Sequence, residues 1–79
     1  MHKPSILTLC YTLARLDHKV RVIKSEVMLA DRLVSITYRH GDLTTHAYAM
    51  ERGDNARRMV QRLRKLRARV YAQYVACQS

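Results

Sequence analysis

The stretch from Arg32 to Met50, RLVSITYRHGDLTTHAYAM, limits the fold most, because apolar and polar residues alternate on both sides of a turn sequence. Alternation with a period of two is typical of a β-strand that is buried on one face only. The tripeptide His40-Gly41-Asp42 supplies the turn, so the stretch predicts a β-hairpin. One face is expected to hold Val34, Ile36, Tyr38, Leu43, Thr45, Ala47 and Ala49. The other is expected to hold Ser35, Thr37, Arg39, Thr44, His46 and Tyr48.

Helical patterns precede and follow this stretch. Residues 4–18 begin with Pro4 and Ser5, which suit a helix N-terminus, and the residues Asp17-His18-Lys19 are expected to end the helix. Residues 54–76 show a second helical pattern, with Asp54 as the expected N-cap. Apolar residues three and four apart predict its buried face. That face contains Ala56, Met59, Leu63, Leu66, Val70, Tyr74 and Cys77.

The order of these elements predicts an α+β fold. The β-branched residues 19–23 are expected to form one more strand, and residues 25–31 are either part of it or a turn of helix. The expected fold is a two-layer α-β-β-β-α domain, with a three-stranded antiparallel sheet and both helices on one face. A chain of 79 residues with two glycines and one proline predicts a single domain over residues 1–79.

Positive charge is concentrated near the C-terminus. The formal net charge is +9, and residues 55–70 hold seven of the fifteen Lys and Arg residues without an acid. On a helix these cations form a stripe with spacings of three and four, and Arg57 lies near the expected helix start. Like charges four apart destabilise a helix, so the stripe predicts a contact surface for negative charge rather than a solvated face. The stripe consists of Arg58, Arg62, Lys65 and Arg69.

The expected α-β-β-β-α order is similar in topology and size to the double-stranded-RNA-binding domain. This resemblance implies shape-selective contacts from the first helix, from a loop between strands and from basic residues at the start of the last helix. Arg57 and Arg58 in GDNARR occupy the last of these places. The Lys-Lys-x-Ala-Lys signature of that family is absent, and the last helix is longer than the family's.

The uncovered face of the expected sheet is a second candidate surface. Arg39, His46 and Tyr48 stand there among Ser and Thr residues. Tyr and Arg side chains on a sheet stack on nucleic-acid bases, and they also anchor protein interfaces. A third reading is that these residues only stabilise the sheet through cross-strand pairs.

Sequence motifs for catalysis or cofactors are not found. The six acids are scattered singly, and neither the four histidines nor the two cysteines show metal-ligand spacing, so no metal, cofactor or enzyme activity is expected. His40 or His46 beside Arg39 could act as an acid–base pair, but turn or structural roles are more common. Cys10 and Cys77 are read as buried free thiols of a cytoplasmic protein, and the chain has no run of apolar residues that would span a membrane.

Two functions fit these features. The first is a non-catalytic nucleic-acid-binding module, DNA or RNA, that contacts phosphates through the Arg-rich helix. The alternative is a small protein-binding regulator or inhibitor, of the kind that phages and mobile elements use against host defences, docking on an acidic surface of a larger complex. Tyr71 and Val75 fall outside the expected buried face, so they suggest a homodimer contact or partly exposed residues.

Overall fold

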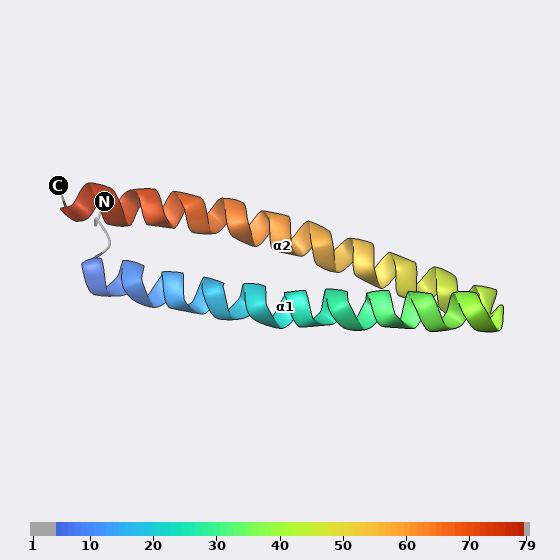
Figure 1. The fold of residues 1–79 in the computed structure, drawn as a ribbon. Helices are drawn as coiled ribbons and strands as arrows, with labels where there is room; N and C mark the ends of the chain where they lie inside the picture. The colour runs from blue at the N-terminus through green and yellow to red at the C-terminus, as the bar shows by residue number, and fades with distance from the viewer. Residues whose placement is uncertain (1–4, 79) are drawn as a thin grey trace.

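The computed structural model describes residues 5–78, and these residues form a hairpin of two long helices (Figure 1). Helix α1 spans Ile6–His40 and helix α2 spans Leu43–Gln78. The hairpin measures 56 × 17 × 16 Å along its principal axes. None of the described residues forms a strand, so the prediction of an α+β sandwich with a three-stranded antiparallel sheet is wrong. The likeness to the double-stranded-RNA-binding domain, which depended on that topology, falls with it.

A repeat of seven residues explains the hairpin. Residues that face the other helix recur at alternating spacings of three and four, which is the pattern of a coiled coil. We call these residues the seam. In α1 they are Leu9, Leu13, Leu16, Val20, Ile23, Val27, Ala30, Val34 and Thr37. In α2 they are His46, Ala49, Gly53, Ala56, Val60, Leu63, Arg67, Val70 and Tyr74.

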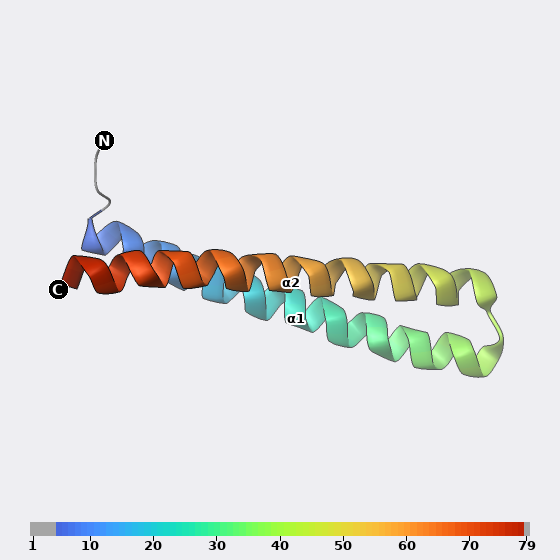
Figure 2. The ribbon, with the colours of Figure 1, turned by 90° about the horizontal axis from the view of Figure 1, so that it is seen from above.

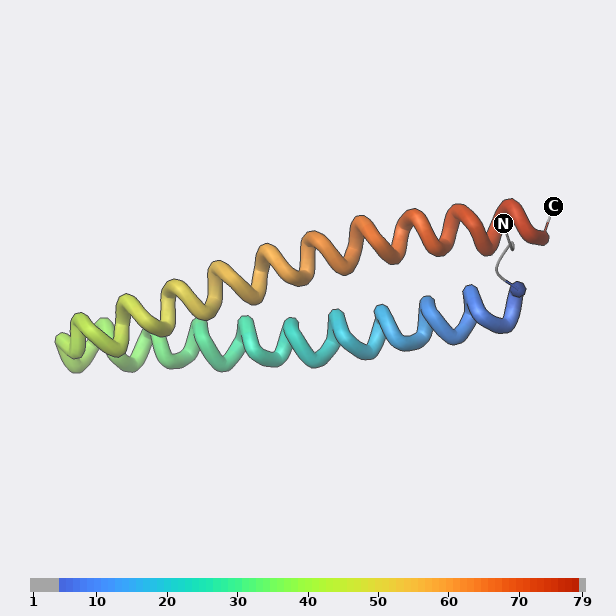
Figure 3. Tube along the Cα trace, turned by 180° about the vertical axis from the view of Figure 1, so that it is seen from behind, coloured from blue at the N-terminus to red at the C-terminus, as the bar shows by residue number. Residues whose placement is uncertain are grey.

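The two helices wind around each other, as a seven-residue repeat requires. They overlap at the turn and lie apart at the open end in Figure 1, whereas Figure 2, turned by 90°, shows the reverse. Seen from behind, the N-terminal end of α1 and the C-terminal end of α2 lie at the same end of the hairpin, opposite the turn (Figure 3). The seam therefore runs along the whole hairpin from the turn to the open end.

Local signals set the helix ends and the turn. Ser5 caps α1, because its hydroxyl accepts a hydrogen bond from the Thr8 backbone N–H at 3.1 Å. Pro4, the other predicted start signal, lies outside the described residues. Gly41 ends α1 in the left-handed conformation (φ 68°), and Asp42 accepts a hydrogen bond from the Thr45 N–H at 3.1 Å. The chain does turn at residues 40–42, but the turn joins two helices.

Helix α1 continues through the residues that were expected to end it and then to form strands. Val20, Val27 and Val34 are β-branched, which favours strands, but their spacing of seven places all three in the seam. Polar residues fit the helix as well, since the Thr37 hydroxyl donates to the Leu33 carbonyl at 2.8 Å. The alternation of Ile36 and Tyr38 does not mark a buried face of the hairpin, because both side chains are exposed.

Helix α2 begins eleven residues before its predicted start. Asp54 is therefore not an N-cap, and the backbone N–H groups of residues 55–57 lie inside the helix. Within the predicted buried face, Ala56 and Val70 are buried, but Met59 and Leu66 are 43% and 44% exposed. Val60, which the prediction missed, is buried. Cys10 and Cys77 are free thiols, but both are exposed, so the prediction of buried thiols is wrong.

The core of the hairpin changes character along its length. Towards the open end, Leu9, Leu16 and Val70 form a buried cluster, against which Leu13, Leu63 and Tyr74 pack. Towards the turn the buried residues are small: Thr37, Ala49, Gly53 and Ala56. A Cβ atom added to Gly53 would lie 3.5 Å from the Ala30 Cβ, so the two backbones approach closely there. The helices are thus held by leucine packing at one end and by close approach at the other.

Candidate nucleic-acid interface

The hairpin divides into two halves of different charge. We call residues 25–56 the loop half, and residues 5–24 with 57–78 the basic half. The loop half has three Arg residues and five acids, a net charge of −2. The basic half has eleven Lys and Arg residues and one acid, a net charge of +10. Because the two segments of the basic half lie along each other (Figure 3), their charges, which fall at residues 15–24 and 57–69, share one region of space.

Two of these cations are engaged by carboxylates. Arg57 contacts Asp31 of α1 at 2.5 Å and Asp54 of its own helix at 3.5 Å. The Arg67 Nε atom donates to Asp17 Oδ1 at 2.6 Å, and the Arg67 guanidinium lies 5.8 Å from the Tyr71 ring centroid. Such partly exposed pairs contribute little net stability, but they link the helices and hold the side chains in place. Arg57, one of the predicted contact residues, is therefore already neutralised.

The four stripe residues Arg58, Arg62, Lys65 and Arg69 differ from that pair. All four are exposed, and their positions in the seven-residue repeat lie on the side of α2 away from α1. Within residues 5–78, none of them forms an ion pair, and the Arg58 guanidinium donates only to the Asn55 amide oxygen at 3.2 Å. At 1.5 Å of rise per residue the stripe extends about 16 Å along α2. It presents four uncompensated cations in one direction.

Further cations lie on both sides of the stripe. Arg64 lines a groove between the helices together with Lys24 and Arg57. By the seven-residue repeat, Arg15 and Lys19 of α1 lie on the opposite flank, the same flank as Arg62 and Arg69. Positive charge therefore surrounds the outer side of α2 rather than forming a single spot.

The second predicted surface does not exist as a face. His46 lies in the seam, where its Nδ1 atom is 3.0 Å from the Thr37 hydroxyl and 3.2 Å from the Val34 carbonyl oxygen. Tyr48 accepts a hydrogen bond from Arg52 at 3.0 Å, which raises the pKa of Arg52 and keeps it charged. Arg39 is exposed in the last turn of α1. The interpretation of Arg39, His46 and Tyr48 as neighbours on an open sheet is thus wrong.

The described residues offer no cluster for metal chemistry. No group of three or more His, Cys, Asp and Glu side chains gathers within residues 5–78. Neither α1 nor α2 contains a window apolar enough to cross a lipid bilayer. The charged surface of α2 is therefore the strongest candidate site on this part of the chain.

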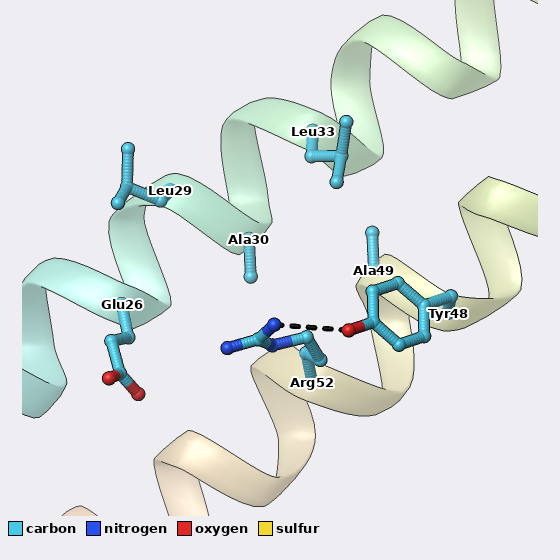
Figure 4. Close-up of a pocket in the computed structure, with 7 residues that line it drawn as sticks. All are labelled: Glu26, Leu29, Ala30, Leu33, Tyr48, Ala49 and Arg52. Carbon is cyan, nitrogen blue, oxygen red and sulfur yellow. Dashed lines mark hydrogen bonds between the residues drawn. The ribbon is translucent and has the colours of Figure 1, made fainter.

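Sequence reasoning missed an apolar surface. Leu29 and Leu33 of α1 and Tyr48 of α2 line a groove of about 220 Å³, and Glu26 and Arg52 line it as well (Figure 4). Leu29 and Leu33 are 64% and 36% exposed. The signal was present in the sequence as apolar residues seven apart, at positions 22, 29 and 36. It was hidden because those residues were assigned to strands or left unassigned.

Comparison with known proteins adds no assignment to this geometry. The chain matches no protein-family model, no curated protein and no solved structure.

Proposed function

We propose that this chain is a non-catalytic nucleic-acid-binding protein that contacts phosphates through the outer side of α2. The stripe of Arg58, Arg62, Lys65 and Arg69 carries the proposal, since all four cations are exposed and form no ion pair among the described residues. Like charges at this spacing repel one another along the helix. Phosphates of a partner would remove that repulsion.

The chemistry of the stripe suits phosphates. Three of its four residues are Arg, whose planar fork donates two parallel hydrogen bonds to phosphate oxygens. Each neutralised phosphate releases condensed counterions, so binding depends steeply on salt. Backbone donors at a helix N-terminus do not contribute, because residues 55–57 lie inside α2. The proposal therefore rests on side chains alone and predicts little preference for base sequence.

The spread of charge favours nucleic acid over an acidic protein. A protein partner is recognised mainly by a few anchors at the centre of a patch. Here cations lie on the outer side of α2 and on both flanks, which suits a partner with a continuous line of negative charge. A small regulator that docks on an acidic protein remains the alternative function and is an outcome of the test below. The proposal goes with a cytoplasmic location, where Cys10 and Cys77 would stay reduced.

The test measures binding to labelled duplex DNA, duplex RNA and single strands by fluorescence anisotropy at several salt concentrations. Four phosphate contacts predict a slope of log K against log salt of about −3.6 for duplex DNA, which is roughly 150-fold weaker binding between about 50 and 200 mM salt. The variant Arg58→Glu/Lys65→Glu removes two contacts and should lower the slope to about −1.8.

A matched control comes from α1. Arg32 and Arg39 are also exposed and seven residues apart, but they lie in the loop half. The variant Arg32→Glu/Arg39→Glu changes the net charge by the same amount and should leave the slope near its original value. Equal losses in both variants would refute the stripe as the contact. If the protein binds no nucleic acid at low salt but binds an acidic polypeptide such as polyglutamate, the regulator alternative replaces the proposal.

A further inference from the structure

We propose that a second copy of this chain covers an apolar flank that runs along the hairpin from the loop half into the basic half, so that two hairpins form an antiparallel four-helix dimer with their open ends pointing apart. The flank, called here the leucine flank, is one side of the hairpin. It comprises Val22, Leu29, Leu33 and Ile36 of α1 and Tyr48, Met59 and Leu66 of α2. This inference is independent of the proposed function.

The leucine flank is continuous and exposed. Leu29, Leu33 and Tyr48 line one groove on this flank, and Met59 lines the next one. Glu26 and Arg52 line both grooves, so the two grooves join. In Figure 4 side chains of α1 line one side of this groove and side chains of α2 line the other. Within α2, Arg52 donates a hydrogen bond to the Tyr48 hydroxyl. The apolar side chains of the flank are between 36% and 64% exposed. A soluble monomer rarely leaves so long a row of large apolar side chains in water.

The opposite flank shows what a solvent-facing side of this hairpin looks like. There the ion pairs of Arg57 with Asp31 and of Arg67 with Asp17 cross between the helices. The grooves on that side are lined by charged residues, among them Lys24 and Arg64. No ion pair between the helices crosses the leucine flank within residues 5–78. The two flanks therefore differ in that ion pairs between the helices close one of them and not the other.

The exposed area of the chain is large enough to supply the interface. The chain exposes 6547 Å², whereas a compact protein of 9.2 kDa exposes about 4,900 Å². The excess, about 1,600 Å², is twice the roughly 800 Å² that each partner buries in a standard interface. Two hairpins packed face to face give a four-helix bundle, a common way for such helices to bury a second apolar side.

Charge decides how the copies are arranged. With both turns at the same end, two basic halves of net charge +10 would lie side by side and repel. With the hairpins antiparallel and centred near Leu29, the loop half of each copy, of net charge −2, lies against the loop half and the adjoining cations of the other, and the open ends extend in opposite directions. A two-fold axis makes the same apolar patch serve both partners.

The first experiment measures the molar mass by sedimentation equilibrium over a range of micromolar concentrations. We expect twice the chain mass of 9.2 kDa for the natural sequence. Leu29→Glu should weaken dimerisation at least 30-fold, as expected for a residue at the centre of an interface. Met28→Glu is the matched control, because Met28 is the neighbouring residue and has similar exposure (59%) but lies on the other flank. The Met28→Glu variant should still form the dimer. A monomeric natural sequence, or equal losses in both variants, would overturn the proposal.

If Leu29→Glu unfolds the chain, a measurement on the natural sequence still tests the proposal. The melting temperature of a dimer that folds and associates together rises with protein concentration, whereas that of a monomer does not. We expect a concentration-dependent melting temperature by circular dichroism. A melting temperature independent of concentration would count against a second copy.

The second experiment determines the arrangement. A spin label on Cys10 in a Cys77→Ser variant reports the distance between the two open ends, and Cys10 is exposed and lies outside the leucine flank. An antiparallel dimer centred near Leu29 places the two labels about 55–60 Å apart, at 1.5 Å per residue. A distance below about 30 Å would show the two open ends together and refute the antiparallel arrangement. If the natural chain forms the dimer but does not bind nucleic acid, only the proposed function is refuted.

Discussion

The loop half and the basic half of this hairpin are held together in different ways. In the basic half the seam holds large residues such as Leu9, Leu16 and Val70, which form a buried cluster. In the loop half the buried seam residues Ala49 and Gly53 are small, and the two backbones approach closely. The comparison teaches that apolar burial inside the hairpin is strongest where charge repulsion is strongest. Large apolar side chains are exposed in both halves, so the halves differ in what the seam buries and not in how much apolar surface they expose.

The largest effect is expected from shortening a seam leucine of the basic half. Leu16 is 6% exposed, and Leu16→Ala removes its packing and leaves a cavity, which should lower the free energy of unfolding by about 3 kcal/mol. Urea denaturation at fixed protein concentration measures the change. Leu7→Ala, at an 82% exposed position of the same helix, is the control and should change little. A loss below about 1 kcal/mol for Leu16→Ala would show that the basic half is not held by its leucine seam.

A smaller loss is expected from enlarging a small seam residue of the loop half. Ala49 is 1% exposed, so the extra atoms of Ala49→Leu would push the helices apart and lower the free energy of unfolding by about 1–3 kcal/mol. The same urea experiment tests this change. Ala47→Leu, two residues earlier at an exposed position, serves as the control. An increase in stability for Ala49→Leu would mean that the close approach of the helices is not required in this half.

The smallest effect concerns Gly53 in the interior of α2. Glycine costs a helix up to about 1 kcal/mol relative to alanine. A methyl group at Gly53 would lie 3.3 Å from the Arg57 guanidinium, 3.5 Å from the Ala30 Cβ and 3.9 Å from Asp31 Oδ1, so the neighbours need to move by only a few tenths of an ångström. We therefore expect Gly53→Ala to raise the free energy of unfolding by about 0.5–1 kcal/mol. Gly41→Ala should lower the free energy of unfolding by about 1–2 kcal/mol, because Gly41 has a positive φ. Destabilisation by Gly53→Ala would show that even one methyl group is too large at this crossing.

Several local features of the fold were predictable from the sequence. Ser5 as a helix start, the turn at residues 40–42 and the helical course of residues 54–76 all follow from short-range signals. The prediction of strands was wrong because Val20, Val27 and Val34 fit two patterns at once. As β-branched residues they favour strands, and seven residues apart they form a coiled-coil seam. The longer pattern, which runs unbroken from Leu9 to Thr37, decides the structure.

The candidate site was predictable in part. The spacing of Arg58, Arg62, Lys65 and Arg69 gives one exposed side of a helix wherever that helix begins, so these side chains lie together in the hairpin. The engagement of Arg57 with Asp31 was not predictable, because it depends on how α1 lies against α2. For the same reason His46 was placed on a sheet surface, although its partners Thr37 and Val34 lie across the turn.

The tight turn at Gly41 has a consequence for the order in which the chain folds. Thr37 and His46 are nine residues apart, so the entropy lost on closing that loop is small, whereas Leu9 and Tyr74 meet only across most of the chain. Pairing of the helices should therefore begin at the turn and proceed outwards like a zipper. The last segments to join, and the first to fray, are residues 5–14 and 70–78, which carry no Lys, Arg, Asp or Glu. The cations of residues 57–69 lie next to them, so a bound polyanion would hold the part of the hairpin that must open after its ends have frayed.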